Sequence, residues 1–149
     1  MFIGTSTNLF ADYVHKIYEF DSFEGLREDW VSINKAKGHF NFNREPPKVK
    51  PNVELVIGWV QNTLEVFLKK KSIIRFVHMD MDTYETSKYI LDRIKPYLAK
   101  NSLILFDELY NFEGWEVGEY KALKETFNEN EYAYRAFQKN GRIVAIEIL

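Results

Sequence analysis

Five acidic residues follow short apolar stretches of the sequence, and side chains of this type in this position can bind a metal ion or a nucleotide. They are Asp21, Asp80, Asp82, Asp107 and Glu108. If the apolar stretches are parallel strands, their carboxyl ends meet at the edge of the sheet where such folds bind ligands. Carboxylates that lie close together repel one another, so this edge requires a cation or hydrogen-bond donors. Oxygen ligands suit Mg²⁺, Mn²⁺ or Ca²⁺ better than zinc, and we expect a divalent metal, with Mg²⁺ as the first candidate.

Asp21 has a second interpretation, which is nucleotide binding. An acidic residue that ends the second strand of a nucleotide-binding fold can accept hydrogen bonds from both ribose hydroxyls. The same residue can instead form a turn or cap a helix, because Ser22 follows it. The spacing alone leaves both roles open.

His78 is a candidate general base. It lies in an apolar stretch two residues before Asp80, so in a strand the two side chains point to the same face. Histidine can exchange a proton near neutral pH, although a single histidine in a strand is more often structural. Trp115, Glu116 and Glu119 could face an acceptor pocket, but packing and a solvated helix face explain them more simply.

Stretches rich in β-branched and aromatic residues alternate with stretches of helical periodicity. The predicted strands are residues 17–20, 53–57, 73–79 and 103–106. Their continuous apolar character is typical of parallel strands that are covered on both faces. The predicted helices are residues 8–15, 64–71, 83–98 and 117–128. Pro96 should kink or shorten the third helix.

The C-terminal part has a different pattern. Residues 132–137 and 143–149 are predicted strands, and Asn140-Gly141 between them is a strong signal for a hairpin turn. The whole pattern predicts one α/β domain over residues 1–149, with a mostly parallel sheet and an antiparallel hairpin at its C-terminal side. Residues 32–52 should form an irregular loop or lid over the site.

Composition narrows the range of partners. The formal net charge is -2 without a long basic run, which argues against a nucleic-acid-binding surface. No apolar run approaches the roughly 20 residues that cross a membrane. The chain has no cysteine, which excludes disulfides and thiolate metal sites. We therefore expect a cytoplasmic protein without nucleic-acid or membrane partners.

Four segments, taken in order, resemble motifs of class I S-adenosylmethionine-dependent methyltransferases similar to macrocin O-methyltransferase. Residues 18–30 resemble "F-D-S-F-E-G-L-P-x-D-W", and residues 58–64 resemble "G-x-F/W-x-x-T-L". Residues 78–87 resemble "H-x-D-x-D-x-Y-x-S/T-T/S", and residues 106–110 resemble "x-D-D/E-Y/L". Each motif is weak alone, but together they are specific and cover nearly the whole chain. The resemblance implies a Rossmann-like, three-layer α/β/α sheet.

The resemblance also implies roles for individual residues. Asp21 would bind the ribose of the cofactor S-adenosylmethionine, and the other implied cofactor-binding residues are Gly4, Ser6, Ser22, Phe23, Gly58 and Trp59. Asp80, Asp107 and Glu108 would hold the metal, with Asp82 as a helix cap. Asp80 and His78 would be the catalytic residues. The metal would bind the hydroxyl of a small-molecule acceptor, a sugar or similar compound, and lower its pKa for methyl transfer.

The sequence departs from this family at its beginning. The family opens with a strand and a glycine-rich loop of the type "E-x-G-x-x-x-G-x-S", of which only Gly4 and Ser6 are plausible remnants here. We therefore expect the first, central strand to be largely missing. Loss of a central strand exposes two unpaired edges, so a homo-oligomer that pairs or swaps strands is a reasonable expectation.

Two other functions remain open at this stage. Asp80-Met81-Asp82 is a D-x-D motif, which in a metal-dependent glycosyltransferase would hold a nucleotide-sugar diphosphate. That motif is common by chance, and it leaves Asp21, Asp107 and Glu108 unexplained. The chain could also be an inactive methyltransferase-like fragment whose carboxylates only cap helices.

Overall fold

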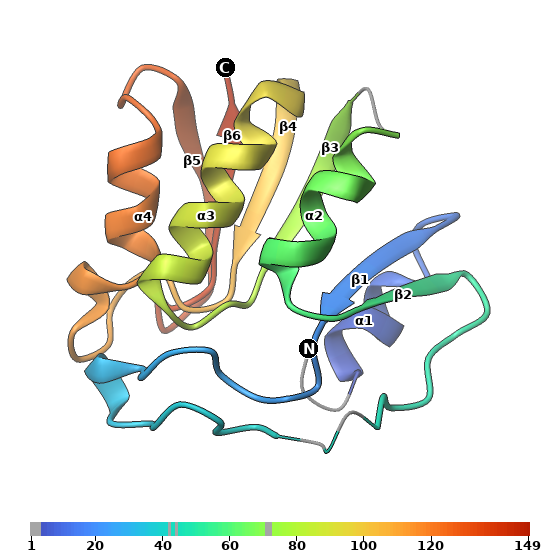
Figure 1. Ribbon diagram of the computed structural model, residues 1–149. Helices are drawn as coiled ribbons and strands as arrows, with labels where there is room; N and C mark the ends of the chain where they lie inside the picture. The colour runs from blue at the N-terminus through green and yellow to red at the C-terminus, as the bar shows by residue number, and fades with distance from the viewer. Residues whose placement is uncertain (1–3, 42, 44, 71–72) are drawn as a thin grey trace.

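The computed structural model describes residues 4–41, 43, 45–70 and 73–149 of the chain (Figure 1). The helices are α1 (Thr5–Phe10), α2 (Val60–Leu68), α3 (Tyr84–Ile94) and α4 (Glu119–Thr126), with short 3-10 helices η1 (Val31–Ile33), η2 (Lys95–Tyr97) and η3 (Trp115–Val117). The strands are β1 (Ile17–Asp21), β2 (Val53–Ile57), β3 (Ile74–Met79), β4 (Leu98–Phe106), β5 (Tyr132–Phe137) and β6 (Val144–Ile148). This order confirms the predicted α/β class.

The strands form two sheets. Strands β1 and β2 pair in parallel, and the second sheet has the order β3-β4-β6-β5. Strands β3 and β4 are parallel, whereas β6 runs antiparallel to both β4 and β5. The C-terminal antiparallel hairpin is thus confirmed. In the described part of the chain β1 and β3 do not pair with each other. The expectation that a central first strand is largely missing stays a prediction.

Helices α2, α3 and α4 cover one face of the sheet (Figure 1). Their apolar sides pack on Met79, Ile104 and Phe106, and this contact forms the core of the protein. The opposite face of β3 carries Phe76 and His78, because neighbouring residues of a strand point to opposite sides. Phe10 of α1 packs edge-on against both rings, with ring centroids 5.6 and 5.1 Å away. Helix α1 therefore lies on the second face, as the three-layer prediction requires.

The predicted boundaries agree with the observed ones better for most strands than for the helices. Helix α3 ends at Ile94 and continues as η2 around Pro96, so the expected shortening by this proline is confirmed. Helix α1 begins and ends earlier than the predicted 8–15, and α2 ends at Leu68. The predicted last residue of α2, Lys71, lies outside the described residues. Strand β4 begins at Leu98, well before the predicted residue 103.

The segment between β1 and β2 runs along the carboxyl ends of the strands (Figure 1). Glu28 ties it to α3, because its Oε1 accepts the backbone N–H of Thr86 at 3.2 Å. At Gly25, with φ of 85°, an added Cβ would lie 2.4 Å from the carbonyl oxygen of His39, so the chain can turn there only with glycine. Its part before residue 41 lies over the site, as expected of a lid, although mostly upstream of the predicted 32–52.

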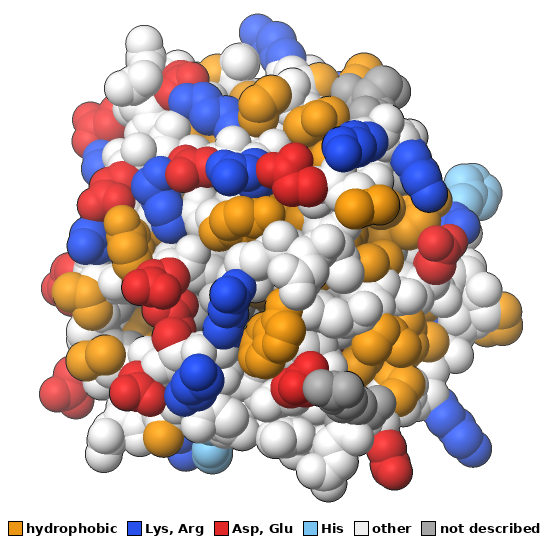
Figure 2. All heavy atoms as spheres, in the orientation of Figure 1, with side chains coloured by type: hydrophobic (Ala, Val, Ile, Leu, Met, Phe, Trp, Pro, Cys, Tyr) orange, Lys and Arg blue, Asp and Glu red, His pale blue; other side chains and the backbone are white. Residues whose placement is uncertain are grey.

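Charges of both signs are mixed on the face that carries α3 and α4 (Figure 2). Lys88 and Asp92 form an ion pair of 2.6 Å within α3, and Lys121 lies 3.9 Å from Glu125 within α4. Exposed pairs of this kind contribute little to stability. Among the described residues, no helix has the length and apolarity needed to cross a membrane.

Candidate active site

A cleft of about 470 Å³ lies at the carboxyl ends of β1, β2, β3 and β4. This is the edge at which the sequence predicted the site, and the volume falls within the range of small-molecule sites. Most of the predicted site residues line it: Gly4, Ser6, Asp21, Ser22, Gly58, Trp59, His78, Asp80, Asp107 and Glu108. Leu26, Arg27, Trp30 and Phe40 of the segment between β1 and β2 complete the wall.

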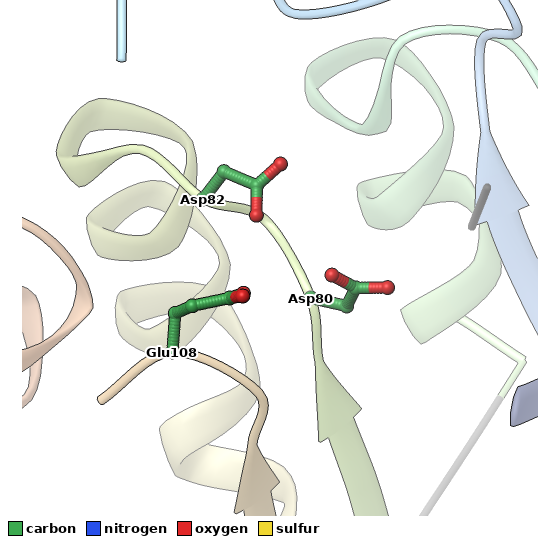
Figure 3. A group of neighbouring side chains, drawn as sticks. All are labelled: Asp80, Asp82 and Glu108. Atoms are coloured by element: carbon green, nitrogen blue, oxygen red, sulfur yellow. The ribbon is translucent and has the colours of Figure 1, made fainter. Parts of the chain in front are cut away.

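In the cleft three carboxylates converge, which we call the carboxylate triad: Asp80, Asp82 and Glu108 (Figure 3). One oxygen of each lies within 4.8 Å of the others. Asp80 and Asp82 come from the turn after β3, and Glu108 comes from the end of β4. The grouping differs in one member from the set that the resemblance implied, because Asp82 takes the place expected of Asp107.

Asp107 does not belong to the triad, because the hydrogen bonding between β3 and β4 extends as far as Asp107. Its backbone N–H donates to the carbonyl of Met79 at 2.9 Å, so Asp107 still follows the alternation of β4 and its neighbour Glu108 points away from it. One Asp107 oxygen lies 3.8 Å from Nε2 of His78. The structure thus pairs Asp107 with the candidate general base. Whether either acts in catalysis stays a prediction.

The triad is electrostatically unfavourable without a cation. Burial, followed by repulsion from Asp80 and Glu108, raises the pKa of Asp82 to about 8. Burial, followed by repulsion from Asp107 and Asp80, raises the pKa of Glu108 to about 7, although the guanidinium of Arg142 counteracts it from 3.4 Å. Burial also raises the pKa of Asp80. A bound cation would remove this repulsion, so the residues present fit a divalent metal.

Asp21 lines the same cleft as the triad. Its Oδ1 accepts the backbone N–H of Phe23 at 2.8 Å, and Oγ of Ser22 accepts that of Glu24 at 3.1 Å. Asp21 is therefore a turn former, and its carboxylate also lines the cleft. The two interpretations that the sequence left open are compatible. Phe23 itself is buried with φ of 56° and does not line the cleft, so it supports the turn from behind.

Glycines stand on both sides of Asp21. The N–H of Gly58 donates to the carbonyl of Asp21 at 3.0 Å, with φ of 130°, and the Trp59 that follows it faces the cleft. Gly4 has φ of 78° and precedes α1, where Ser6 also lines the cleft. Positive φ angles favour glycine and allow a ligand to approach the backbone closely.

Glu119 contacts the turn that carries Asp80 and Asp82, although it does not line the cleft. The sequence favoured packing or a solvated helix face for it, and an exposure of only 1% excludes the solvated face. Its Oε1 accepts the backbone N–H of Met81 at 3.1 Å, between two residues of the triad, and burial raises its pKa well above the usual value. The two residues are 38 positions apart, so local spacing holds no signal for this contact.

Comparisons with known proteins agree with this fold. A family model described as "Methyltransferase domain" matches residues 1–109. A search of curated proteins finds no match. Among solved structures, the calicheamicin methyltransferase CalS11 aligns with a TM-score of 0.71 and 23% identity over 97% of this chain and 65% of that one.

Two further structures show the same fold. Apo CalS11, described as a TDP-rhamnose 3'-O-methyltransferase, has a TM-score of 0.63 and 22% identity over 97% of this chain and 63% of that one. The O-methyltransferase NovP has a TM-score of 0.63 and 17% identity over 94% of this chain and 63% of that one. The chain thus spans slightly less than two thirds of these relatives. The chain belongs to the methyltransferase-domain family and has the fold of class I S-adenosylmethionine-dependent methyltransferases.

Proposed function

We propose that the protein is an S-adenosylmethionine-dependent O-methyltransferase that uses a divalent metal to methylate the hydroxyl group of a small molecule. One observation carries the proposal: Asp21 and the carboxylate triad line the same cleft. The cofactor and the metal-bound acceptor would then meet inside one cleft. Methyl transfer requires this in-line placement more than any other contribution from the protein.

The residues around Asp21 fit the cofactor. An ionised carboxylate that already accepts one backbone N–H has remaining lone pairs for ribose hydroxyls. Trp59 offers a flat apolar surface to the adenine, and Gly4 and Gly58 let the ligand approach the backbone. When bound, the cofactor supplies a sulfonium methyl group that is already electrophilic.

The triad fits the metal. Asp80, Asp82 and Glu108 present hard oxygen ligands, which suit Mg²⁺ and leave further positions for the acceptor and water. When bound, the ion would lower the pKa of the acceptor hydroxyl. His78, with Asp107 at 3.8 Å, lines the same cleft and would take up the hydroxyl proton.

Two features support a sugar or a similar compound as the acceptor. The cleft has a size typical of small-molecule sites. The structural relatives include an enzyme described as a TDP-rhamnose 3'-O-methyltransferase. Arg27, which lies 6.0 Å above the ring of Trp59, and Phe40 come from the segment between β1 and β2 and would help to select the acceptor.

Calorimetric titration with S-adenosylhomocysteine, with and without Mg²⁺, tests the cofactor site. We expect Asp21→Ala to abolish binding, because ribose hydroxyls lose their acceptor. Asp29→Ala is the matched control: Asp29 also accepts a backbone N–H, that of Lys37 at 2.7 Å, but it does not line the cleft. Equal losses in both variants would mean that loop folding, and not ribose recognition, is being measured.

The same titration separates the alternatives. Binding of a nucleoside diphosphate in the presence of Mg²⁺, without binding of S-adenosylhomocysteine, would favour the glycosyltransferase that Asp80-Met81-Asp82 left open. A folded protein that binds neither ligand would be an inactive methyltransferase-like domain. A ligand that binds only the native state must stabilise it, so thermal unfolding gives an independent measure of each result.

A further inference from the structure

The turn that carries two residues of the triad has a strained backbone. The N–H of Thr83 donates to the carbonyl of Met81 at 2.6 Å, which closes a three-residue turn around Asp82. Asp82 has φ of 63°, and a three-residue turn with positive φ is rare and strained. Such a conformation persists only where the surrounding structure holds it in place. A residue outside the turn must therefore fix it.

The first residue of α4 makes this contact. The Oε1 of Glu119 accepts the N–H of Met81 at 3.1 Å, and Met81 lies between Asp80 and Asp82 in the sequence. Its Oε2 is buried and has no hydrogen-bond partner, so among the described residues the carboxyl group of Glu119 is hydrogen-bonded only to the turn. Burying a carboxyl group for a single hydrogen bond is unfavourable for stability, and this suggests that Glu119 is present for another reason.

Helix α4 is a rigid support for this contact. Its residues Ala122 and Leu123 are fully buried in the core, one turn beyond Glu119. Gly118, which precedes Glu119, lies next to the turn, since a Cβ added to it would be at ordinary van der Waals distance, 3.9 Å, from the carbonyl oxygen of Asp82. The start of α4 thus lies beside the turn and is anchored by the packing of the helix in the core.

We propose that Glu119 is a positioning residue of the metal site, which holds the turn at Met81 so that Asp80 and Asp82 point at the same ion. This inference rests on the metal site of the proposed function. Partners that orient the ligands of a metal without touching it commonly change its affinity by about 10- to 100-fold. Glu119 would therefore change the metal affinity strongly, although it does not itself bind the ion.

The test is a titration of the full chain with MnCl₂, with free Mn²⁺ followed by electron paramagnetic resonance. We expect Glu119→Ala to weaken Mn²⁺ binding by about 10-fold or more, because the Met81 N–H loses its acceptor. Glu119→Gln keeps an amide oxygen at the same reach, so its affinity should stay within about threefold of the wild type. Leu123→Ala on the same helix is the matched control for general loosening of α4.

Hydrogen exchange of the Met81 amide gives a second readout that needs no metal. The amide should be protected in the wild type and in Glu119→Gln, and it should exchange faster in Glu119→Ala. Faster exchange without weaker Mn²⁺ binding would overturn the proposal, as would an equal loss of affinity in Leu123→Ala. If the wild-type protein binds no Mn²⁺, both the metal site and this role of Glu119 are refuted. If the wild type binds Mn²⁺ and Glu119→Ala binds it equally well, only the role of Glu119 is refuted.

Discussion

Replacing Asp82 by asparagine should change the way in which the stability of the metal-free protein depends on pH. Burial and neighbouring carboxylates raise the pKa of Asp82 from 3.8 to about 8 and that of Glu108 from 4.5 to about 7. In the unfolded chain both groups lose their protons near the lower values, so at intermediate pH the folded state binds more protons. The resulting stability is fully present below about pH 4 and is lost as the pH rises to about 8.

The size of this effect follows from the pKa of Asp82. The interval between its two pKa values spans roughly four pH units, each worth about 1.4 kcal/mol, which sets an upper limit of about 6 kcal/mol. Asp82 and Glu108 are hydrogen-bonded to each other and titrate as a pair, so we expect about half of this limit, about 3 kcal/mol. Asparagine cannot ionise, and its amide can donate to Glu108 as a protonated Asp82 does.

Urea unfolding in EDTA, followed by circular dichroism, measures the effect. From about pH 5 to about pH 9 the wild type should lose about 3 kcal/mol more than Asp82→Asn, which keeps the raised pKa of Glu108. Mg²⁺ should restore the wild type at the higher pH, because a ligand of the native state stabilises it. Glu129→Gln, at an exposed carboxylate, is the control and should keep the wild-type slope. Parallel curves for the wild type and Asp82→Asn would refute the reasoning.

Two further substitutions test the parts of the fold that hold the cleft. Gly25→Ala should destabilise the protein by about 2–3 kcal/mol and weaken binding of S-adenosylhomocysteine, because its Cβ would lie 2.4 Å from the carbonyl oxygen of His39. Gly38→Ala is the control, because Gly38 has a similar φ but open space around it, and this change should cost about 1 kcal/mol. Equal losses of stability in urea unfolding of the two variants would contradict the clash at Gly25. Phe106→Ala should lose about 3–5 kcal/mol by the same measurement, since Phe106 is fully buried under the helices, and a loss below about 1 kcal/mol would contradict its place in the core.

The sequence predicted the fold well because a strand of this kind is visible in a short stretch of residues. Continuous apolar stretches that end in an acidic residue identified β1 and β3 and, through their carboxyl ends, the edge of the cleft. The predicted start of β4 was wrong because residues 98–102 contain a bulge. Asn101 has φ of 66°, and the Ser102 hydroxyl accepts the Ala99 N–H and donates to the Ile74 carbonyl. A side chain that replaces ladder hydrogen bonds in this way leaves no apolar periodicity to detect.

The membership of the carboxylate triad was harder to predict, for a geometric reason. Asp107 and Glu108 are adjacent, and while the ladder continues only one of two adjacent side chains can face a given point. Asp82 enters the triad because its backbone leaves the extended region. Neither fact can be read from residue type. The contact of Glu119 with Met81 depends on the packing of α4, which only the folded chain determines.

Asp80 of the triad and Asp21 interact through charge, so we expect binding of the metal and binding of the cofactor to be coupled. Among the effects that raise the pKa of Asp80, after burial and the nearer Asp107, is repulsion from Asp21. A cation at the triad would offset this repulsion between the carboxylates of Asp80 and Asp21. Coupling of this kind is reciprocal, so the cofactor should in turn favour the metal. Tighter binding of S-adenosylhomocysteine in the presence of Mg²⁺ would thus be expected even if the two ligands never touch, because the ion offsets the repulsion between the carboxylates of Asp80 and Asp21.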